Sequence, residues 1–278
     1  MSKTKYTYAV ARIRALEVSL LTNAVIEQLL ACKSAEQALQ LLVEKGWGDL
    51  TAGTLDADEV LNKEEEKVWQ TIREVAPDMH VFDVLSLPKL YHNLKAAIKE
   101  VCTEVENKNI FYDDCEISGE EMYAIVQNKE FDKLPGNMPA TAREAFDTLL
   151  HTRDGQLCDL IIDRATLEAM LEAGKKSGEK IIEEYAQTAV AIADIKIAVR
   201  SQKTGKNADF MKKAMVNCSE INVDQLTQAA LAGVEEIAQY LEGTSYREGA
   251  DALRISPSAF ERWCDNKMTD SMRSQKYE

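Results

Sequence analysis

Two adjacent aspartates, Asp113 and Asp114, are the residues of this sequence that point most directly to chemistry. They lie in the segment FYDDCEISGEE, together with Glu116, Glu120 and Glu121. Carboxylate oxygens are the ligands that Mg²⁺ prefers, so an all-α enzyme could use the pair for diphosphate chemistry. A second aspartate-rich stretch, which that chemistry requires, does not occur in the sequence. Because acidic residues also favour the positive end of a helix dipole, we interpret the cluster as a helix start and keep the magnesium enzyme as the alternative.

Histidine, cysteine and phosphate-loop chemistry have less support. The three histidines, His80, His92 and His151, are far apart and have no partner at ligand spacing. Cys158 has no activating neighbour, so we expect an ordinary buried thiol. TGKNAD at Thr204 lacks the upstream glycine and the following Ser or Thr of a phosphate-binding loop. The sequence therefore predicts no catalytic, cofactor-binding or metal-binding residue.

The charge balance excludes broad classes of partner. The 278 residues include 33 Lys+Arg and 47 Asp+Glu, a formal net charge of −14, which disfavours binding to phosphate backbones. No apolar run is long enough to cross a bilayer, and the N-terminus has no secretory pattern. The six cysteines are scattered without a C-x-x-C pair, which favours reduced thiols. We expect a cytoplasmic protein that binds no nucleic acid and reaches a membrane only through a partner.

The elements that position these residues are predicted to be helices throughout. Apolar residues follow the helical period, and 12 Gly, 5 Pro and few alternating β-branched stretches leave little from which to build a sheet. Capping boxes are indicated at Ser34–Gln37 and Ser118–Glu121, and glycines that end helices at Gly46, Gly174 and Gly243. The expected helices are Thr4–Leu21, Asn23–Ala31, Ser34–Lys45, Asp58–Val75, Pro88–Glu106, Ser118–Lys129, Pro139–Thr152, Leu157–Glu172, Gly178–Gln202, Asn207–Met215, Val223–Ala232, Val234–Leu241 and Ser256–Asn266.

A polar–aliphatic–basic triplet recurs three times on these helices. It reads Arg12-Ile13-Arg14, then Asn93-Leu94-Lys95, then Asp194-Ile195-Lys196, and the extended forms NLKAAIK and DIKIAVR match by class at nearly every position. Each triplet helix precedes an amphipathic segment and a short piece with an aromatic residue near Gly or Pro, as in LVEKGWGD, NKEFDKLPG and LEGTSYREG. The pattern predicts one helical unit used three times, with boundaries at 1–77, 78–177 and 178–278; chance similarity among amphipathic helices is the alternative.

The opening helix, YTYAVARIRALEVSLL, carries two apolar stripes. At 3.6 residues per turn the first stripe contains Tyr6, Ala9, Ile13, Leu16 and Leu20, and the second contains Tyr8, Ala11, Ala15 and Val18. Arg12 lies in one seam between the stripes, and Arg14 lies in the other with Glu17. A helix with two apolar faces packs against neighbours on two sides. The arginines then either reach water or a carboxylate, or face a shared cavity or a partner.

Four segments resemble the family of the central-stalk C protein of bacterial and archaeal A/V-type rotary ATPases, which is named d in eukaryotic V-ATPases. YTYAVARIRALEVSLL is similar to the tyrosine-bearing first helix of that family with its R-x-R-x-L-E stretch. LIIDRATLEAMLEAGKKSG resembles the segment before a long inner helix, EEYAQTAVAIADIKIAVRSQKTGKNADFMKKAMV resembles that helix, and SPSAFERWCDN resembles a later F-E-x-x-x-D segment. The matching residues are Asp163, Leu167–Leu171, Tyr185, Asp194, Lys196, Arg200, Phe260, Glu261 and Asp265.

The resemblance implies an all-α, pseudo-threefold funnel of three similar helical subdomains and a non-catalytic function without cofactors. Family members sit on the membrane ring of proteolipid subunits and hold the shaft formed by the D and F subunits of a proton- or sodium-translocating ATPase. Arg12 or Arg14 would line the socket for the shaft. Family chains usually continue into a G-x-E-P segment and two further helices, whereas this sequence stops at SQKYE. We therefore expect the third unit to be incomplete at its C-terminal end. An unrelated helical scaffold is a further alternative.

Overall fold

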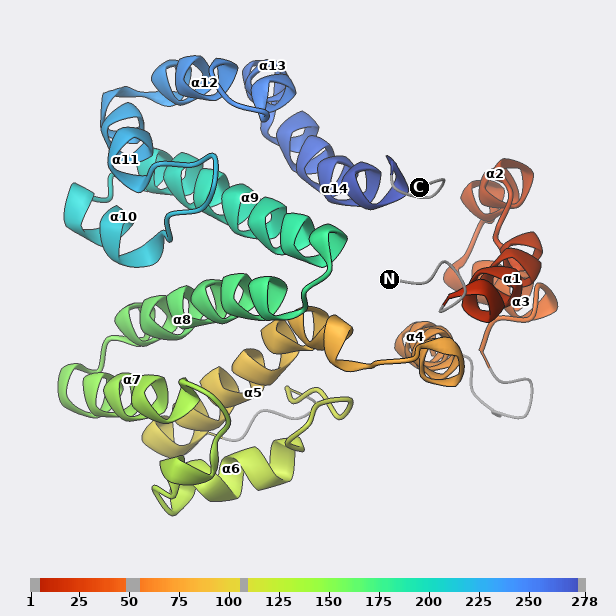
Figure 1. The fold of residues 1–278 in the computed structure, drawn as a ribbon, viewed down its shortest axis with the longest axis horizontal. Helices are drawn as coiled ribbons and strands as arrows, with labels where there is room; N and C mark the ends of the chain where they lie inside the picture. The colour runs from red at the N-terminus through yellow and green to blue at the C-terminus, as the bar shows by residue number, and fades with distance from the viewer. Residues whose placement is uncertain (1–5, 49–55, 106–109, 275–278) are drawn as a thin grey trace. The chain divides into compact units, whose positions relative to one another are not determined.

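The computed structural model describes residues 6–48, 56–105 and 110–274 of the chain. Within these ranges every regular element is a helix and no strand occurs, which confirms the all-α prediction. The chain divides into two compact units, Met1–Met79 and His80–Glu278. Figure 1 labels the helices of both units.

The first unit has a very small core. It contains α1 (Thr7–Leu16), a 3₁₀ turn at Glu17–Ser19, α2 (Asn23–Ala31), α3 (Ala35–Glu44) and α4 (Ala57–Val75). Side chains of Thr22, Ser34 and Asp56 accept backbone N–H bonds at the starts of α2, α3 and α4. Among the described residues of these helices, however, only Val60 is buried. Local capping, rather than burial of apolar surface, defines these helices.

The second unit begins with four helices packed around one apolar core. These are α5 (Asp83–Thr103), α6 (Gly119–Gln127), α7 (Met138–Thr152) and α8 (Gly155–Lys176), with 3₁₀ turns at His80–Phe82 and Phe131–Lys133. Helix α8 packs against both α5 and α7. The largest fully buried side chains of this core are Leu94, Ile98, Met122, Met138 and Ile162.

Six further helices surround a second core. They are α9 (Lys180–Thr204), α10 (Ala208–Ala214), α11 (Val223–Ala232), α12 (Val234–Glu242), α13 (Arg247–Ile255) and α14 (Pro257–Ser274). Helix α9 contacts α8 on one side and α10, α11, α12 and α14 on the others. The largest fully buried side chains here are Ile195, Met211, Met215, Ile221, Leu226, Ile237 and Leu241.

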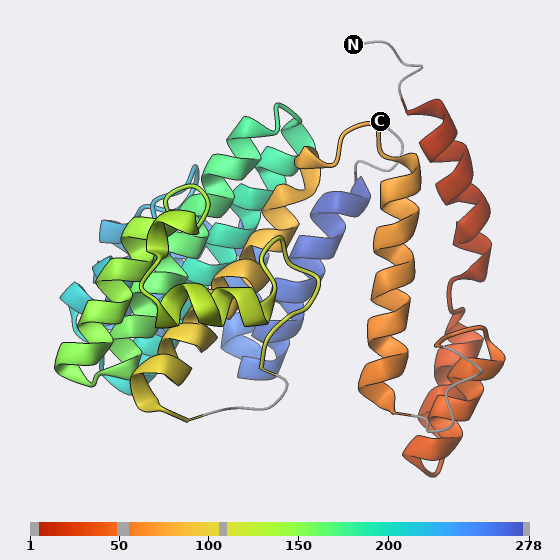
Figure 2. The same cartoon turned by 90° about the horizontal axis from the view of Figure 1, so that it is seen from below.

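Gly174 joins the two groups of helices and corrects one prediction. It does not end a helix but lies inside α8, two residues before its last residue, Lys176. A Cβ added at Gly174 would lie 2.6 Å from the Cβ of Ala186 on α9, so the missing side chain lets α8 and α9 approach closely. Figures 1 and 2 both show α5, α8 and α9 side by side in the second unit.

Other helix boundaries differ from the predictions for local reasons. Helix α5 begins five residues before Pro88 and carries this proline inside it, although the proline predicted a helix start. Helix α13 was not among the expected helices; it contains Gly249, a residue of low helix propensity, whose Cβ, if present, would lie 2.6 Å from the ring of Trp263. The opening helix ends at Leu16 in a 3₁₀ turn, and α14 extends eight residues past Asn266. Thr4, Lys5, Asp49 and Glu106, which belong to predicted segments, lie outside the described residues.

Candidate functional site

The triplets on α5 and α9 place a buried polar side chain at the same position, where each fixes a distant backbone segment. Asn93 accepts a hydrogen bond from the backbone N–H of Tyr112 at 2.8 Å and donates one to its carbonyl at 2.8 Å. Asp194 accepts from the N–H of Val216 at 3.1 Å. Both polar side chains are fully buried, as are Leu94 and Ile195, the next residues of the triplets. The first residues of these two triplets are therefore alike in one respect, since each is a buried polar side chain that accepts a hydrogen bond from a backbone N–H in a distant segment.

The basic residues of these two triplets face the opposite way and pair with carboxylates on a later helix. Lys95 on α5 pairs with Asp163 on α8. On α9, the Nζ of Lys196 lies 2.6 Å from Glu261 on α14, and Arg200 lies 3.7 Å from the same carboxylate. The hydrogen bond from Lys196 holds the pKa of Glu261 below its usual value, with burial acting in the opposite direction. Helices α5 and α9 are thereby each bound both to a loop and to a later helix.

Asp194 has the most perturbed electrostatic environment of this arrangement. Its Oδ2 is buried and has no hydrogen-bond partner among the described residues. Burial raises the pKa of its carboxyl to about 7, and the N–H bond from Val216 and the charge of Arg164 offset only part of that effect. Arg164 lies on α8, where it also donates to the carbonyls of Lys212 and Lys213 at the end of α10.

The triplet on α1 differs from the other two. Its central residue, Ile13, is 40% exposed, whereas Leu94 and Ile195 are 0% exposed. Arg12 lies 3.7 Å from Glu74 on α4, and Arg14 donates to Glu17 at 3.0 Å within its own turn. The pairing of Arg14 with Glu17 is the one that the sequence predicted. A role of either arginine in a socket remains a prediction.

The two aspartates of the adjacent pair have different surroundings. Asp113 is exposed, and Asp114 lies 2.6 Å from the Nζ of Lys89. No group of three or more His, Cys, Asp or Glu side chains that could hold a metal ion occurs among the described residues. Ser118 accepts from the N–H of Glu121 at 3.2 Å, so the helix start predicted for this segment is confirmed.

The histidines and Cys158 have separate environments. His80 lies 3.3 Å from Asp83, and His92 contacts the carbonyl oxygen of Ile110 at 2.9 Å. Cys158 is fully buried, and burial raises the pKa of its thiol to about 11, which disfavours the nucleophilic thiolate. The prediction that Cys158 is an ordinary buried thiol is confirmed.

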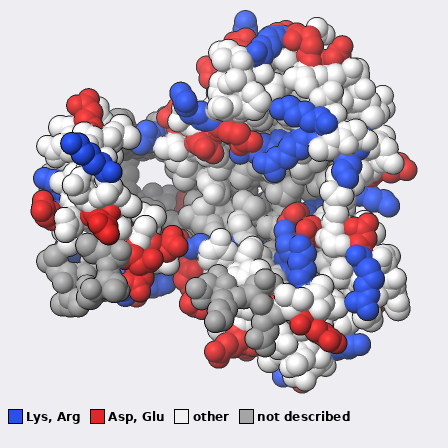
Figure 3. Space-filling view, turned by 180° about the vertical axis from the view of Figure 1, so that it is seen from behind, with Lys and Arg blue, Asp and Glu red and all other residues white. Residues whose placement is uncertain are grey.

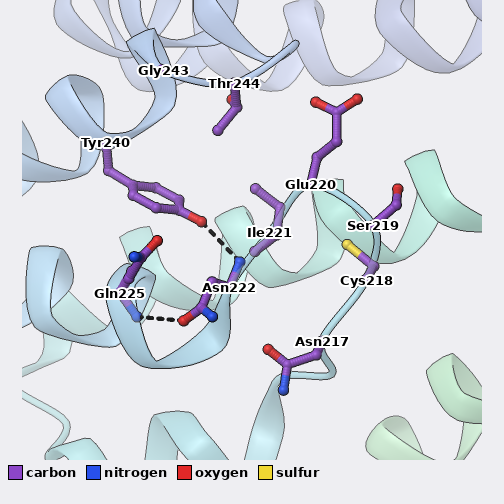
Figure 4. Close-up of a pocket in the computed structure, with 10 residues that line it drawn as sticks. All are labelled: Asn217, Cys218, Ser219, Glu220, Ile221, Asn222, Gln225, Tyr240, Gly243 and Thr244. Carbon is purple, nitrogen blue, oxygen red and sulfur yellow. Dashed lines mark hydrogen bonds between the residues drawn. The ribbon is translucent and has the colours of Figure 1, made fainter.

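A polar cavity that the sequence did not indicate lies between the segment after α10 and the end of α12. Its volume is about 570 Å³. The hydroxyl of Tyr240 accepts from the N–H of Asn222 at 2.8 Å across one wall, as Figure 4 shows. Burial raises the pKa of Cys218 in another wall, so this thiol is not activated either. The lining residues are Asn217, Cys218, Ser219, Glu220, Ile221, Asn222, Gln225, Tyr240, Gly243 and Thr244.

The surface has no large region of one charge on the face that Figure 3 draws, where acidic and basic side chains lie next to each other. Interspersed charges of this kind are typical of a solvated surface rather than of a binding site for a polyanion. Among the described helices, none has the length and apolar content needed to span a bilayer.

Comparison with known proteins points to one family. Residues 9–278 match the family described as ATP synthase (C/AC39) subunit. The C subunit of the V-type sodium ATPase of Enterococcus hirae is 22% identical over 238 residues, which cover 85% of this chain and 73% of that protein. The C subunit of the A-type ATP synthase of Methanocaldococcus jannaschii is 23% identical over 280 aligned positions, which cover 87% of this chain and 66% of that protein.

Proposed function

This chain belongs to the ATP synthase (C/AC39) subunit family, and on that premise we propose that it is a non-catalytic adaptor in the rotor of a V/A-type ATPase. The resemblance predicted from the sequence is confirmed at the level of the family, whose members include the C subunits of V-type and A-type ATPases. In the proposed role the chain connects the D–F shaft to the membrane proteolipid ring, so that rotation and ion transport are coupled.

The match over residues 9–278 carries this proposal, because it spans all the described helices from the third residue of α1 onward. The contacts that hold the triplet helices α5 and α9 in place also support the proposal. An adaptor that transmits torque needs helices that are fixed to their neighbours on more than one side. On α9, Asp194 holds the backbone at Val216 while Lys196 holds Glu261 on α14. Among the described residues, no group of three or more His, Cys, Asp or Glu side chains could hold a metal ion, so no observation favours the alternative of a magnesium enzyme.

The proposal includes a finer architecture of three helical units, 1–77, 78–177 and 178–278, arranged with pseudo-threefold symmetry as a funnel. Its support is the shared geometry of Asn93 and Asp194, and the separate apolar cores around α5 and α9. It also includes a location at the cytoplasmic face of the membrane, reached through the proteolipid ring.

The test is reconstitution of the purified chain with a D–F shaft, followed by size-exclusion chromatography and native mass spectrometry. We expect a complex of one copy each of this chain, D and F. We also expect no ATP hydrolysis by the chain alone. Failure to co-elute with the shaft would contradict the shaft-binding part of the proposal, and failure to bind detergent-solubilised proteolipid rings would contradict the membrane part.

A further inference from the structure

Two side chains of α9 hold the segment that connects α10 to α11. We call Val216–Glu220 the α10–α11 loop. The N–H of Val216 donates to Oδ1 of Asp194 at 3.1 Å, and the N–H of Ser219 donates to Oε1 of Gln187 at 2.8 Å. Of these two acceptors, only the carboxylate of Asp194 ionises. A change in its charge therefore acts directly on the start of the loop.

The α10–α11 loop lies between two fixed points and borders open space. Met215 before it and Ile221 after it are 1% and 0% exposed, so the apolar core fixes both of its ends. Asn217, Ser219 and Glu220 are exposed and belong to the wall of the polar cavity of about 570 Å³, as Figure 4 shows. The loop thus has space to move into while its ends stay in place.

The buried carboxyl of Asp194 favours different loop positions in its two protonation states. The side chain is 0% exposed, and its Oδ2 has no hydrogen-bond partner among the described residues. Ionisation there creates a charge that has lost its water and has gained one backbone donor. Burial consequently raises the pKa of Asp194 to about 7, from its ordinary value of 3.8. Displacement of the loop would let water reach the carboxylate and remove this cost.

Other groups near Asp194 do not ionise or lose charge in the same pH range. The groups on neighbouring elements that interact with its charge are Arg164 on α8, Cys218 in the loop and Tyr240 on α12. Arg164 stays positive and favours the ionised carboxylate. Burial raises the pKa of the Cys218 thiol and of the Tyr240 phenol, so both stay largely neutral up to pH 8.

Charged side chains on the other helices that pack on α9 have partners of their own. Lys212 on α10 and Asp224 on α11 pair with each other at 2.6 Å. Glu261 on α14 pairs with Lys196, two residues after Asp194 and so on the opposite side of α9. The charge that changes beside the loop between pH 5 and pH 8 is therefore that of Asp194.

We propose that Asp194 and the α10–α11 loop form a proton-dependent switch, in which the loop is closed on α9 when Asp194 is protonated and opens toward the polar cavity when Asp194 is ionised. The closed loop binds the proton more tightly than the open loop, so raising the pH shifts the population toward the open form. Such opening needs less free energy than global unfolding, because only the loop loses contacts. The switch is a property of the chain alone and does not depend on the proposed function.

Hydrogen exchange of the full-length chain, followed by NMR between pH 5 and pH 8, tests the switch. The quantity is the protection factor, which is the exchange rate of an unprotected peptide at the same pH divided by the observed rate. For the amides of Val216 and Ser219 it should fall about tenfold for each pH unit between pH 5 and pH 7, and level off above the pKa of Asp194. Amides in the middle of α9 should stay better protected than those of the loop at every pH.

The chain provides a matched internal control. The N–H of Tyr112 donates to Asn93 at 2.8 Å, which is the corresponding contact of α5 with a side chain that does not ionise. Its protection factor should not change with pH. In Asp194→Asn the protection factor of the Val216 amide should likewise become independent of pH.

Gln187→Met separates the switch from a general loosening of the loop. It removes the acceptor of the Ser219 amide and leaves Asp194 in place. We expect a lower protection factor at Ser219 at every pH, with the pH dependence at Val216 retained.

Three outcomes would overturn the inference. The first is a protection factor at Val216 that stays constant between pH 5 and pH 8 in the natural chain. The second is an equal fall in Asp194→Asn, which would assign the response to another group. The third is an equal fall for the amides of α9, which would show global unfolding without a separate opening of the loop. Binding of the D–F shaft tests the proposed function independently of all three.

Discussion

Replacing Asp194 by asparagine is expected to stabilise the protein at neutral and alkaline pH. The two triplet helices provide the reason. Both polar atoms of the Asn93 amide form hydrogen bonds with the backbone of one residue, Tyr112. Asp194 accepts only one hydrogen bond, and its Oδ2 is buried without a partner among the described residues. An ionised carboxylate in such a place has lost water without gaining a full set of donors. Asparagine keeps the size and the accepting oxygen and stays neutral at every pH.

The size of the effect follows from the pKa of Asp194. In the unfolded chain the carboxyl has its ordinary pKa of 3.8. In the folded chain its pKa is about 7, so it keeps its proton until the pH approaches that value. Between these values the folded state binds more protons than the unfolded state, so the free energy of unfolding falls as pH rises. At ~1.4 kcal/mol per pH unit, the loss accumulates to about 4 kcal/mol by pH 8 and then stays constant.

Other charged and polar groups near Asp194 affect the size of this pH-dependent loss of stability. Arg164 on α8 favours the ionised carboxylate and so reduces the effect. Cys218, in the segment before α11, and Tyr240 on α12 interact with the same charge, and burial raises the pKa of both. Neither thiol nor phenol ionises below pH 8, so Asp194 is the group of this cluster that titrates between pH 4 and pH 8.

The assay is urea unfolding followed by circular dichroism at several pH values between 4 and 8, with the free energy extrapolated to water. The quantity of interest is the difference between Asp194→Asn and the natural chain, because all other titrating groups cancel in it. That difference should grow by roughly 4 kcal/mol from pH 4 to pH 8. The reciprocal variant, Asn93→Asp, should acquire a pH dependence of the same sign. Parallel stability curves for Asp194→Asn and the natural chain would refute the reasoning.

Three further predictions concern packing, an ion pair and a thiol. Gly174→Ala should lower the free energy of unfolding by about 1–3 kcal/mol in urea titrations, because its Cβ would lie 2.6 Å from that of Ala186. Lys196→Met should cost at most about 1 kcal/mol, measured the same way at low and high salt, because the pair with Glu261 is partly exposed. Cys158 should resist iodoacetamide at pH 8 until the protein unfolds, as followed by mass spectrometry, since burial raises its thiol pKa to about 11.

Matched positions in the same chain control these measurements. Gly155→Ala, in the first turn of α8, should change stability little, because no atom lies within 4 Å of the added Cβ. Cys32 is less buried than Cys158 and should be alkylated in the folded protein. A destabilisation by Gly155→Ala as large as that by Gly174→Ala, or equal labelling rates for the two cysteines, would contradict the packing described for α8.

The helices were predictable where local chemistry decides them. Ser34 and Ser118 cap helices as their sequence contexts predict, and Asn23–Ala31 and Val223–Ala232 have the predicted bounds. Prediction failed where tertiary packing overrides local preference. Gly249 disfavours a helix on its own, yet it lies inside α13, where the ring of Trp263 occupies the space that a side chain would take. The role of Gly174 depends in the same way on Ala186, a residue on another helix.

The functional features were predictable only in part. The repeated triplet in the sequence pointed to Asn93 and Asp194 as corresponding positions, and in the structure each is buried and accepts a backbone N–H bond, while the three-unit repeat itself stays a prediction. Their partners could not be foreseen, because Tyr112 and Val216 lie in irregular segments about 20 residues away that carry no periodic signal. The polar cavity near Tyr240 was missed for the same reason, since loop backbone forms much of its wall.

The contact at Gly174 also has a mechanical consequence. Where two helices meet through long side chains, rotamer changes let one helix slide or roll over the other with little resistance. Here the Cα of Gly174 faces the methyl group of Ala186, and neither residue has a side-chain torsion angle that can relax. A twist applied to α9 near this point must displace the backbone of α8 rather than be absorbed by side chains. The α8–α9 pair should therefore behave as a stiff lever, with its compliance confined to the Ser177–Gly178 turn.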